Sequence, residues 1–584
     1  MNIILTTLNS KYIHSNLALR VLRAYCRNKY PDIRIMEFTI NDPLDHIISS
    51  LAAEKPQLLG FSCYIWNIRP TLDIISTIKK ILPDCKILLG GPEVSYDGEE
   101  LLYNNHLIDY IIKGEGEQTF YELLNSLTQG KDLEHVNGLI WRNEVRIVTN
   151  QPRKLIELDS VPFAYEEGLS GLKNKIIYYE TSRGCPYRCQ YCLSSTTGKV
   201  RFLTMDRVKQ ELAWFVRSGV SQVKLVDRTF NCNAERAKEI FRYLISLGGS
   251  TNFHFEMAGD LIDKEMLDVL KTAPVGLFQF EIGVQSTRDS TLSLIERKTN
   301  INKIREAVLN LIELDNIHIH LDLIAGLPDE DIYSMAQSVN HVLQMRPHRL
   351  QLGFLKLLKG SGLREKAEDY NYQYTDYPPY EVLCNHVLSF EELDLLKRIE
   401  KLIEIYYNSH RFEKSVAYLI DINNGDAYKV FKDMADYWYN KGLYRYSHSK
   451  ISIYEHLLNY AKTLDSVQMY LFCQLLRFDF VRHEKPGKYP EGLEPPHNEI
   501  KELSSWLYKF LQNKENVEQY LPKWQDCTPK QILRWTHLDY YSYPLHLEGD
   551  LAYQKDKTVL LFDYKHRNGV KKRPNLIVLK NNRL

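Results

Sequence analysis

Short apolar runs alternate with amphipathic helical patterns through residues 1–130, and this alternation constrains the fold more than any other feature. The run NIILTTL (2–8) precedes a helical pattern at 15–28, and the run LLGFSCY (58–64) precedes another at 68–82. Short buried strands separated by helices predict a parallel, doubly wound sheet. Ligands of such sheets bind at the carboxyl ends of the strands, so we expect a binding site there.

A second alternating series occupies residues 173–365. Its six strand patterns, separated by helical patterns, predict βα units with right-handed crossovers, which make an incomplete barrel. At roughly 150 residues per domain, a chain of 584 residues predicts three to four domains. The expected fold class is α/β, with a Rossmann-like N-terminal domain (1–130), a hairpin and linker (131–172), an incomplete (βα)6 barrel (173–365) and a mainly helical C-terminal domain (366–584).

The C-terminal portion has a different pattern. Long helical patterns cover 390–412 and 454–483, and the tail at 551–579 suggests strands. This portion is also rich in Tyr and Trp. We expect it to complete a substrate pocket by capping the open barrel.

Charge, hydropathy and cysteine content limit the partners and the cell compartment that we expect for this protein. Lys plus Arg balances Asp plus Glu at 74 each, so no net charge draws the chain to nucleic acid, and a small-molecule substrate is favoured over RNA. No apolar run approaches the ~20 residues of a membrane helix, and the first residues lack the basic region of a signal peptide. Ten cysteines are too few for a disulfide scaffold, so we expect a cytoplasmic protein without membrane contact, whose clustered thiols are metal ligands or catalysts.

Three cysteines, Cys185, Cys189 and Cys192, gather within eight positions directly after an apolar run. Thiolates on so short a loop can converge on one soft metal centre. Structural zinc is the alternative, but a closed zinc site needs four ligands and no fourth Cys or His lies nearby. An iron–sulfur cube usually takes four cysteines as well, so three leave one iron open for chemistry on a bound molecule.

The motif CPYRCQYC, placed after a strand at the head of an incomplete barrel, resembles the radical S-adenosylmethionine (SAM) enzymes. The resemblance spans roughly residues 173–360. It implies a [4Fe–4S] cluster held by the three cysteines, whose open iron binds SAM and whose electron cleaves it to a 5′-deoxyadenosyl radical. By position at the ends of successive strands, it implies these SAM contacts: Tyr191, Asp227, Arg228, Glu256, Glu281, Gln285 and Gly326. Asp227 and Arg228 are the expected contacts of the SAM amino group, and Gly326 is expected to admit adenine close to the backbone.

The first domain resembles the cobalamin-binding domain of cobalamin-dependent radical SAM enzymes. We expect Gly90 and Gly91 to leave backbone room for the corrin or its nucleotide tail. Acidic side chains are expected to accept hydrogen bonds from corrin amides. A dinucleotide site is less favoured because the G-x-G-x-x-G fingerprint is absent. The expected cobalamin contacts are Asn9, Tyr12, Asn16, Ser62, Tyr64, Gly90, Gly91, Pro92, Glu93, Gly114, Glu115 and Glu117.

One departure from the cobalamin pattern concerns cobalt ligation. Domains that ligate cobalt through histidine usually carry Asp-x-His-x-x-Gly after the first strand, whereas this chain has NSKYIHSN, with His14 but without the Asp and Gly. We therefore expect cobalamin bound without a protein imidazole on cobalt. His14 as the axial ligand is the alternative.

The resemblance implies a cobalamin-dependent radical SAM enzyme that methylates an unactivated carbon, with a flavodoxin- or ferredoxin-type protein as electron donor. A first alternative keeps both cofactors but performs a rearrangement, ring contraction or cyclisation without methyl transfer. A second alternative is a non-catalytic cobalamin- or nucleotide-binding regulator with a zinc-stabilised loop.

Overall fold

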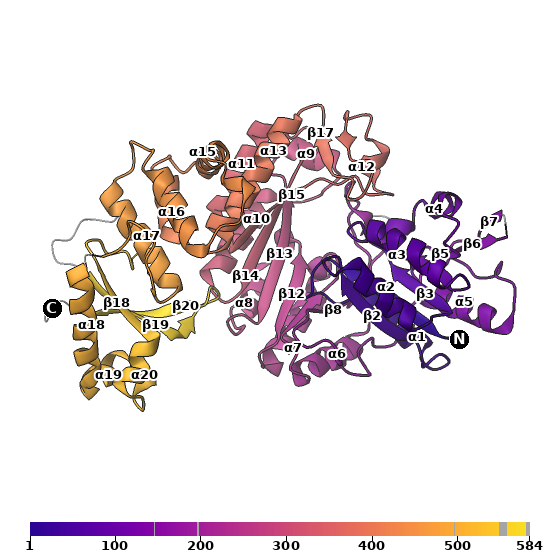
Figure 1. Cartoon of the computed structure of the whole chain (residues 1–584), viewed down its shortest axis with the longest axis horizontal. Coiled ribbons are helices and arrows are strands. Elements are labelled where there is room, and N and C mark those ends of the chain that lie inside the picture. Colours follow the sequence, from indigo (N-terminus) through magenta and orange to yellow (C-terminus); the bar gives the residue numbers. More distant parts are fainter. Residues whose placement is uncertain (145, 195–197, 496, 548–557, 580–584) are drawn as a thin grey trace.

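The computed structural model describes residues 1–584 except 145, 195–197, 496, 548–557 and 580–584. Figure 1 shows three bodies in a row, with the N-terminal domain at one end, the barrel in the middle and the C-terminal helices at the other end. Within the described residues, no helix is long and apolar enough to cross a membrane. The α/β architecture agrees with the predicted fold class.

The N-terminal domain is one seven-stranded sheet in the order β2-β1-β3-β4-β5-β6-β7. The first five strands are parallel, and apolar residues fill both faces of the sheet, where the helices cover it. The bounds are β1 Ile3–Asn9, α1 Leu17–Cys26, β2 Arg34–Thr39, α2 Leu44–Ala53, β3 Leu58–Ser62, α3 Ile68–Ile81, β4 Lys86–Gly90, α4 Gly98–Asn104, β5 Tyr110–Ile112 and α5 Glu117–Gln129.

The predicted hairpin lies at β6 (Leu139–Asn143) and β7 (Arg146–Thr149), and it extends the first sheet instead of standing apart from it. A further difference concerns the run 108–117, which the pattern predicts as one strand. The strand β5 ends at Ile112, because Gly114 has a positive φ of 77° and Glu117 already begins α5. The end of β5 is therefore a loop that faces the neighbouring domain.

The barrel is a six-stranded, all-parallel open sheet in the order β15-β14-β13-β12-β11-β8. Strands β9 (Ser182–Arg183) and β10 (Arg201–Phe202) pair antiparallel beside it and flank the cysteine loop. The remaining bounds are β8 Ile177–Tyr179, α6 Met205–Arg217, β11 Gln222–Leu225, α7 Ala234–Leu247, β12 Asn252–Met257, α8 Lys264–Leu270, β13 Phe278–Gln285, α9 Asp289–Leu294, α10 Ile301–Glu313, β14 His318–Ala325, α11 Ile332–Gln344 and β15 Arg349–Phe354.

Much of the C-terminal portion shares one continuous hydrophobic core with the barrel, and residues from 503 on also form a separate core. The single pattern at 454–483 breaks into two helices, and the tail forms the antiparallel sheet β18-β19-β20. Bounds are α12 Gly362–Glu365, β16 Gln373–Tyr374, β17 Val382–Cys384, α13 Phe390–Leu402, α14 Glu413–Asp421, α15 Ala427–Asn440, α16 Lys450–Ala461, α17 Met469–His483, α18 His497–Gln512, α19 Lys514–Tyr520, α20 Pro529–Trp535, β18 Thr536–Tyr541, β19 Thr558–Asn568 and β20 Arg573–Leu579.

A π-helical turn at 403–408 covers the open edge of the barrel at β15. There the side chain of Asn408 accepts a hydrogen bond from the Leu350 amide (2.9 Å) and donates one to the Leu350 carbonyl (2.8 Å). Asn408 thus replaces the strand that a closed barrel would place beside β15. The bulk of the C-terminal helices lies on the side of the barrel away from the N-terminal domain (Figure 1).

Candidate functional site

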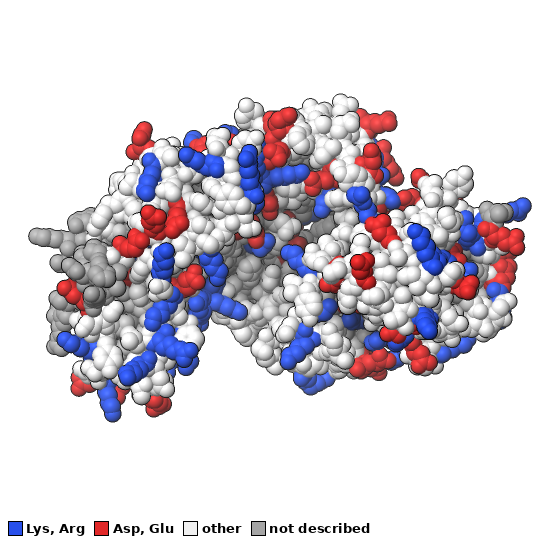
Figure 2. All heavy atoms as spheres, viewed as in Figure 1, with Lys and Arg blue, Asp and Glu red and all other residues white. Residues whose placement is uncertain are grey.

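A cavity of about 630 Å³ lies between the N-terminal sheet and the barrel. One wall is formed by the residues that follow β1, β3, β4 and β5, which is where a doubly wound sheet binds ligands. The other wall is formed by Tyr178, Glu180, Arg183 and Arg228 of the barrel. Figure 2 shows a hollow where the two domains meet, with acidic and basic side chains interspersed over this face.

Most of the predicted cobalamin contacts line this cavity, and two do not. Tyr12 is 68% exposed, and its ring lies under the Lys175 ammonium instead of facing the cavity. Glu93 is buried and pairs with Lys359 (3.2 Å) and with the Tyr380 hydroxyl. The predicted corrin contacts of these two residues are thus not supported by their positions. The lining includes Asn9, Asn16, Ser62, Tyr64, Gly90, Gly91, Pro92, Gly114, Glu115 and Glu117.

The glycines at the ends of β4 and β5 test whether a bulky cofactor fits. A Cβ added to Gly90 would meet only the Ile112 Cβ, at 3.9 Å, and one added to Gly114 would meet nothing within 4 Å. Gly91 differs, because its Cβ would lie 2.5 Å from the Cys63 carbonyl oxygen. Gly91 is therefore required for packing against Cys63, and not, as predicted, to leave room for the corrin. Gly90 and Gly114 leave the open backbone that a corrin requires.

His14 also lines the cavity. Its Nδ1 lies 2.7 Å from the Tyr178 hydroxyl at the end of β8, across the domain boundary. Burial lowers the pKa of His14, and the neighbouring lysines Lys11, Lys224 and Lys175 lower it further. The lowered pKa favours the neutral imidazole, and one of its nitrogens already contacts the Tyr178 hydroxyl.

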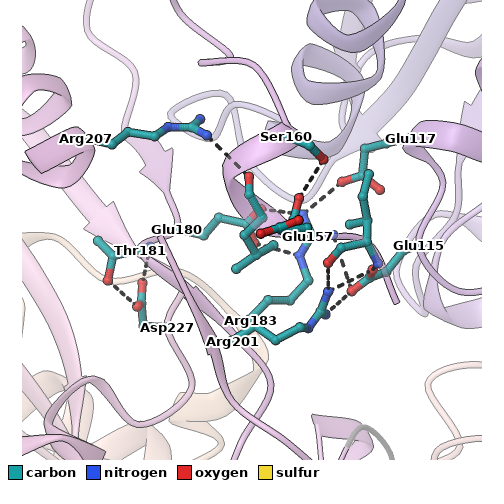
Figure 3. Close-up of polar contacts among 12 residues, drawn as sticks. Glu115, Glu117, Glu157, Ser160, Glu180, Thr181, Arg183, Arg201, Arg207 and Asp227 are labelled. Atoms are coloured by element: carbon teal, nitrogen blue, oxygen red, sulfur yellow. Dashed lines mark hydrogen bonds and ion pairs between the residues drawn. The ribbon is translucent and has the colours of Figure 1, made fainter. Parts of the chain in front are cut away.

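An ion-pair network joins the two domains beneath the cavity (Figure 3). Arg183, on β9, binds Glu117 (2.8 Å) and Glu180, and Arg201, on β10, binds Glu115. Although burial alone raises the pKa of Glu115, the hydrogen bond from Arg201 and the charge of Arg183 bring it below its usual value. Glu115 and Glu117, two of the three glutamates predicted to accept hydrogen bonds from corrin amides, are therefore paired with arginines, and no local sequence pattern predicts this pairing.

The cysteine loop connects β9 to β10. Its three cysteines are not joined in disulfides; Cys189 is 5% exposed and the other two are partly exposed. The Cys192 amide bonds to the Cys189 carbonyl (3.0 Å), so the last two cysteines lie on one tight turn. Three cysteine thiols within eight residues provide the soft donor set that an iron–sulfur cluster with one open iron requires.

Arg297, after α9, adds a positive charge beside this loop. Its Nη1 lies 3.9 Å from the Cys189 sulfur and donates to the Tyr191 hydroxyl (3.3 Å). Burial raises the pKa of the Cys189 thiol, and the guanidinium of Arg297 opposes that rise. Since the thiolate is the metal ligand, Arg297 favours the ligating form. The sequence signals it only as the RK pair of LIERKTN, with nothing that links it to the cysteines.

Asp227 has a different role from the predicted SAM contact. The residue is 1% exposed, and its carboxylate accepts hydrogen bonds from the Thr181 amide (2.9 Å), the Thr181 hydroxyl (2.6 Å) and the Ser182 hydroxyl (2.6 Å). These bonds hold the segment that leads into the cysteine loop (Figure 3). Asp227 therefore positions the loop, whereas its neighbour Arg228 lines the cavity.

Three of the remaining predicted SAM contacts lie on β12 and β13. Burial raises the pKa of Glu256, and Glu281 pairs with Lys224 (2.9 Å) on the inner face of the barrel. Gln285 folds over Gly283, where a Cβ would lie 2.1 Å from its Nε2. These positions leave their predicted SAM contacts as proposals.

Gly326 is the exception, because the chain itself fills its surroundings. Its carbonyl accepts a hydrogen bond from the Tyr372 hydroxyl (2.9 Å), and a Cβ there would contact Leu355, Val382 and Leu393. The expected space for adenine at this glycine is occupied by these side chains. The glycine is required by its φ of 92°.

Three protein-family models match the chain. Residues 3–124 match the B12 binding domain, residues 179–339 the radical SAM superfamily, and residues 368–562 a protein family of unknown function. The predicted cofactors, cobalamin, SAM and a [4Fe–4S] cluster, are therefore confirmed as those of its two cofactor domains. The radical SAM match speaks against the alternative of a regulator with a zinc loop.

Several curated enzymes are similar to part of the chain. The chain is 28% identical over 342 residues to the cobalamin-dependent radical SAM methyltransferase TokK of Streptomyces tokunonensis, covering 54% of this chain and 49% of that protein. It is 25% identical to the hopanoid C-3 methylase of Methylococcus capsulatus, covering 54% of this chain and 61% of that protein. It is 29% identical to the anaerobic magnesium-protoporphyrin IX monomethyl ester cyclase of Synechocystis, covering 45% and 54%. The chain thus spans about half the length of these relatives.

Solved structures share the fold. The cobalamin-dependent SAM radical enzyme OxsB aligns with a TM-score of 0.58 at 17% identity, covering 82% of this chain and 78% of that one. The radical SAM methyltransferase TsrM of Kitasatospora setae, with cobalamin and a [4Fe–4S] cluster bound, aligns with a TM-score of 0.54 at 17% identity, covering 65% and 79%. The chain thus combines a segment that matches the B12 binding domain, a segment that matches the radical SAM superfamily and a C-terminal segment that matches a family of unknown function.

Proposed function

We propose that this chain is a cobalamin-dependent radical SAM methyltransferase that places a methyl group on an unactivated carbon of a small molecule. The observation that carries the proposal is the cavity whose one wall is the end of the B12-binding sheet and whose other wall belongs to the radical SAM barrel. A ligand in that cavity contacts both domains at once. The methyltransferases among the relatives support the reaction class.

When bound, the cluster and SAM supply a 5′-deoxyadenosyl radical, and cobalamin supplies the methyl group. In this proposal Cys185, Cys189 and Cys192 hold the cluster, and Arg297 favours the thiolate form of Cys189. Arg228 and Glu256 are the proposed polar contacts of SAM. The open backbone at Gly90 and Gly114 receives the corrin.

The ion pairs of Arg183 and Arg201 hold the two domains at a fixed separation in this proposal. A radical reaction between two cofactors needs that separation to be maintained, since a displacement of about 1 Å costs on the order of 10²-fold in rate. The π-helical turn at 403–408 and the C-terminal helices close the barrel edge. We propose that they thereby complete the substrate pocket, and that a flavodoxin- or ferredoxin-type protein supplies the electron.

A second candidate outcome keeps both cofactors but ends in a cyclisation without methyl transfer. The cyclase among the relatives favours it. The two outcomes differ in their SAM products. Methylation consumes SAM to give both S-adenosylhomocysteine and 5′-deoxyadenosine, whereas cyclisation gives only the deoxyadenosine.

The test is anaerobic reconstitution with iron, sulfide and hydroxocobalamin, followed by reduction and quantification of both SAM products. We expect about four irons per chain and 5′-deoxyadenosine formation. Cys189→Ala should lose the cluster absorbance and nearly all product. Cys473→Ala, which removes a thiol from α17 in the C-terminal portion, is the matched control and should retain both. Full iron content and turnover in Cys189→Ala would contradict the proposal.

A further inference from the structure

The inner face of the barrel sheet carries titratable side chains. Along β13, Phe278, Phe280, Ile282 and Val284 are buried against the covering helices, whereas the alternate residues, Glu281 among them, are partly exposed on the opposite face. This alternation is the period of two expected of a strand with two different environments. The partly exposed face therefore lines the interior of the open barrel.

Three residues of this inner face lie close together. Glu281 of β13 is paired in register with His320 of β14, and Asp322 follows two residues later on the same face. One ligand atom from each of the three lies within 4.8 Å of the other two. Among the residues that the structure describes, no other group of three or more His, Cys, Asp or Glu side chains converges in this way.

A second observation is that buried polar atoms at this cluster lack hydrogen bonds. His320 is 6% exposed, and its Nε2 lies 2.8 Å from the Asp322 Oδ1, yet neither atom has a hydrogen-bond partner of acceptable geometry. The Nε2 of His254, which is 7% exposed, is also without one, 3.1 Å from the Glu281 Oε2. A buried polar atom left unsatisfied costs about 1–3 kcal/mol, so several around one point indicate a missing ligand.

The charges of the cluster identify the ligand as a cation. Glu281 and Asp322 bring two carboxylates, and the Lys224 ammonium, 2.9 Å from the Glu281 Oε2, is the one positive group in direct contact with them among the described residues. An imidazole nitrogen combined with carboxylate oxygens suits divalent first-row metals such as Mn²⁺, Fe²⁺ and Zn²⁺. Three protein ligands leave coordination positions open, which is typical of a site that binds a further molecule.

We propose that Glu281, His320 and Asp322 form a divalent-metal site inside the barrel, whose open positions take an oxygen donor of the substrate, such as a carboxylate or hydroxyl. The site is separate from the cysteine loop in both residues and donor chemistry. The part of this proposal that concerns the substrate rests on the proposed function, and it narrows the substrate to small molecules with a polar oxygen group. Binding of the metal itself does not depend on that function.

The test is a Mn²⁺ titration of the full chain carrying its cluster and cobalamin. With the cluster oxidised and cobalt trivalent, both cofactors are diamagnetic, so the electron paramagnetic resonance signal of free Mn²⁺ reports binding. The cysteines are occupied by iron and do not compete. We expect about one Mn²⁺ per chain, because one group of three ligands is present.

His320→Ala and Asp322→Asn should each weaken Mn²⁺ binding by more than about tenfold, a loss seen even for residues that only support a metal ligand. The matched control is His318→Ala, on the same strand and face but outside the trio, which should retain the affinity. Lys224→Met should tighten binding several-fold, because it removes the ammonium that competes for Glu281.

Absence of Mn²⁺ binding by the unmodified protein, or equal affinities in His320→Ala and His318→Ala, would overturn the proposed metal site. Circular dichroism of each variant identifies any loss that comes from misfolding. SAM cleavage measured on the unmodified protein separates the two proposals. A protein that cleaves SAM but binds no Mn²⁺ refutes only the metal site, and one that binds Mn²⁺ but cleaves no SAM refutes only the proposed function.

Discussion

The two walls of the interdomain cavity differ in what their groups already do. On the wall of the B12-binding domain, the backbone at Gly90 and Gly114 faces open space. On the barrel side, Arg183 is already paired with Glu180 of the barrel and with Glu117 of the N-terminal domain. The wall of the B12-binding domain therefore leaves space for a large ligand that no side chain of the protein fills. The ion pairs of Arg183 on the other wall hold the two domains together whether or not a ligand is bound.

The largest expected effect is the loss of stability that follows from removing Arg183, whose ion pairs join the two domains. Arg183→Met leaves Glu117, whose side chain is 6% exposed, and Glu180 without their cation. Removing one partner of a buried pair costs about 3–5 kcal/mol, so we expect a large fall in the thermal midpoint of the N-terminal and barrel unit. Differential scanning calorimetry measures it.

The control for that prediction is Arg27→Met. Arg27 also pairs outside the N-terminal domain, with Glu166 of the linker, but the Glu166 side chain is 59% exposed and an exposed pair contributes only about 0–1 kcal/mol. Equal midpoints for Arg183→Met and Arg27→Met would show that the buried network does not hold the domains together.

Substitutions at the adjacent glycines Gly90 and Gly91 distinguish a residue needed for folding from one that leaves space for the corrin. Gly91→Ala places a Cβ against the Cys63 carbonyl at a φ of 112°, so it should destabilise the domain by about 2–3 kcal/mol. Gly90→Val meets little of the chain and should leave stability nearly unchanged, but it should weaken cobalamin binding by on the order of tenfold or more, because its side chain occupies the cavity. Thermal denaturation and hydroxocobalamin titration of both variants check this. The reverse pattern would refute the proposed corrin position.

A buried carboxyl on the barrel side predicts a dependence of stability on pH. Glu330, after β14, accepts hydrogen bonds from Ser286 (2.7 Å) and Ser338 (3.0 Å), but its Oε2 has no partner. Burial raises its pKa to about 7, which the two serine hydrogen bonds only partly oppose. The native state therefore binds more protons than the unfolded state between about pH 4.5 and 7, and stability falls as the pH rises through that window.

Glu330→Gln should remove this dependence. The variant should match the parent near pH 4.5 and exceed its stability by about 3 kcal/mol at pH 8, because the amide carries no charge to bury. Chemical denaturation at the two pH values measures the difference. A parent protein whose stability is flat between pH 4.5 and 7 contradicts the raised pKa.

The smallest expected effect concerns Tyr12. Because its ring lies outside the cavity under Lys175, Tyr12→Ala should change hydroxocobalamin affinity by less than about twofold, as expected of an exposed residue away from the site. A loss of tenfold or more would restore Tyr12 to the predicted cobalamin contacts.

The sequence was sufficient to predict features that follow from local pattern. The strand–helix alternation gave both parallel sheets, and the strand ends of the first domain, such as Asn9, Ser62 and Gly90, were placed at the cavity because carboxyl ends of parallel strands share one edge. The spacing of the three cysteines was likewise local. These features need only the period of side chains along one segment.

The remaining features depend on contacts between segments distant in sequence. Glu115 accepts a hydrogen bond from Arg201, 86 positions later in the sequence, and Glu93 accepts one from Tyr380, 287 positions later. The residues next to either glutamate in the sequence therefore do not predict its partner. The same holds for Gly326, whose surroundings are filled by residues of β17 and α13. An acidic residue at a strand end is compatible with a ligand or with an arginine, and only the tertiary structure decides between them.

Anomalous scattering from crystals of the reconstituted protein tests most directly whether one cavity serves both domains. We expect an iron peak at Cys185, Cys189 and Cys192, and a cobalt peak inside the cavity between Gly90 and Tyr178. A cobalt peak elsewhere, or an iron peak away from the three cysteines, would contradict this expectation.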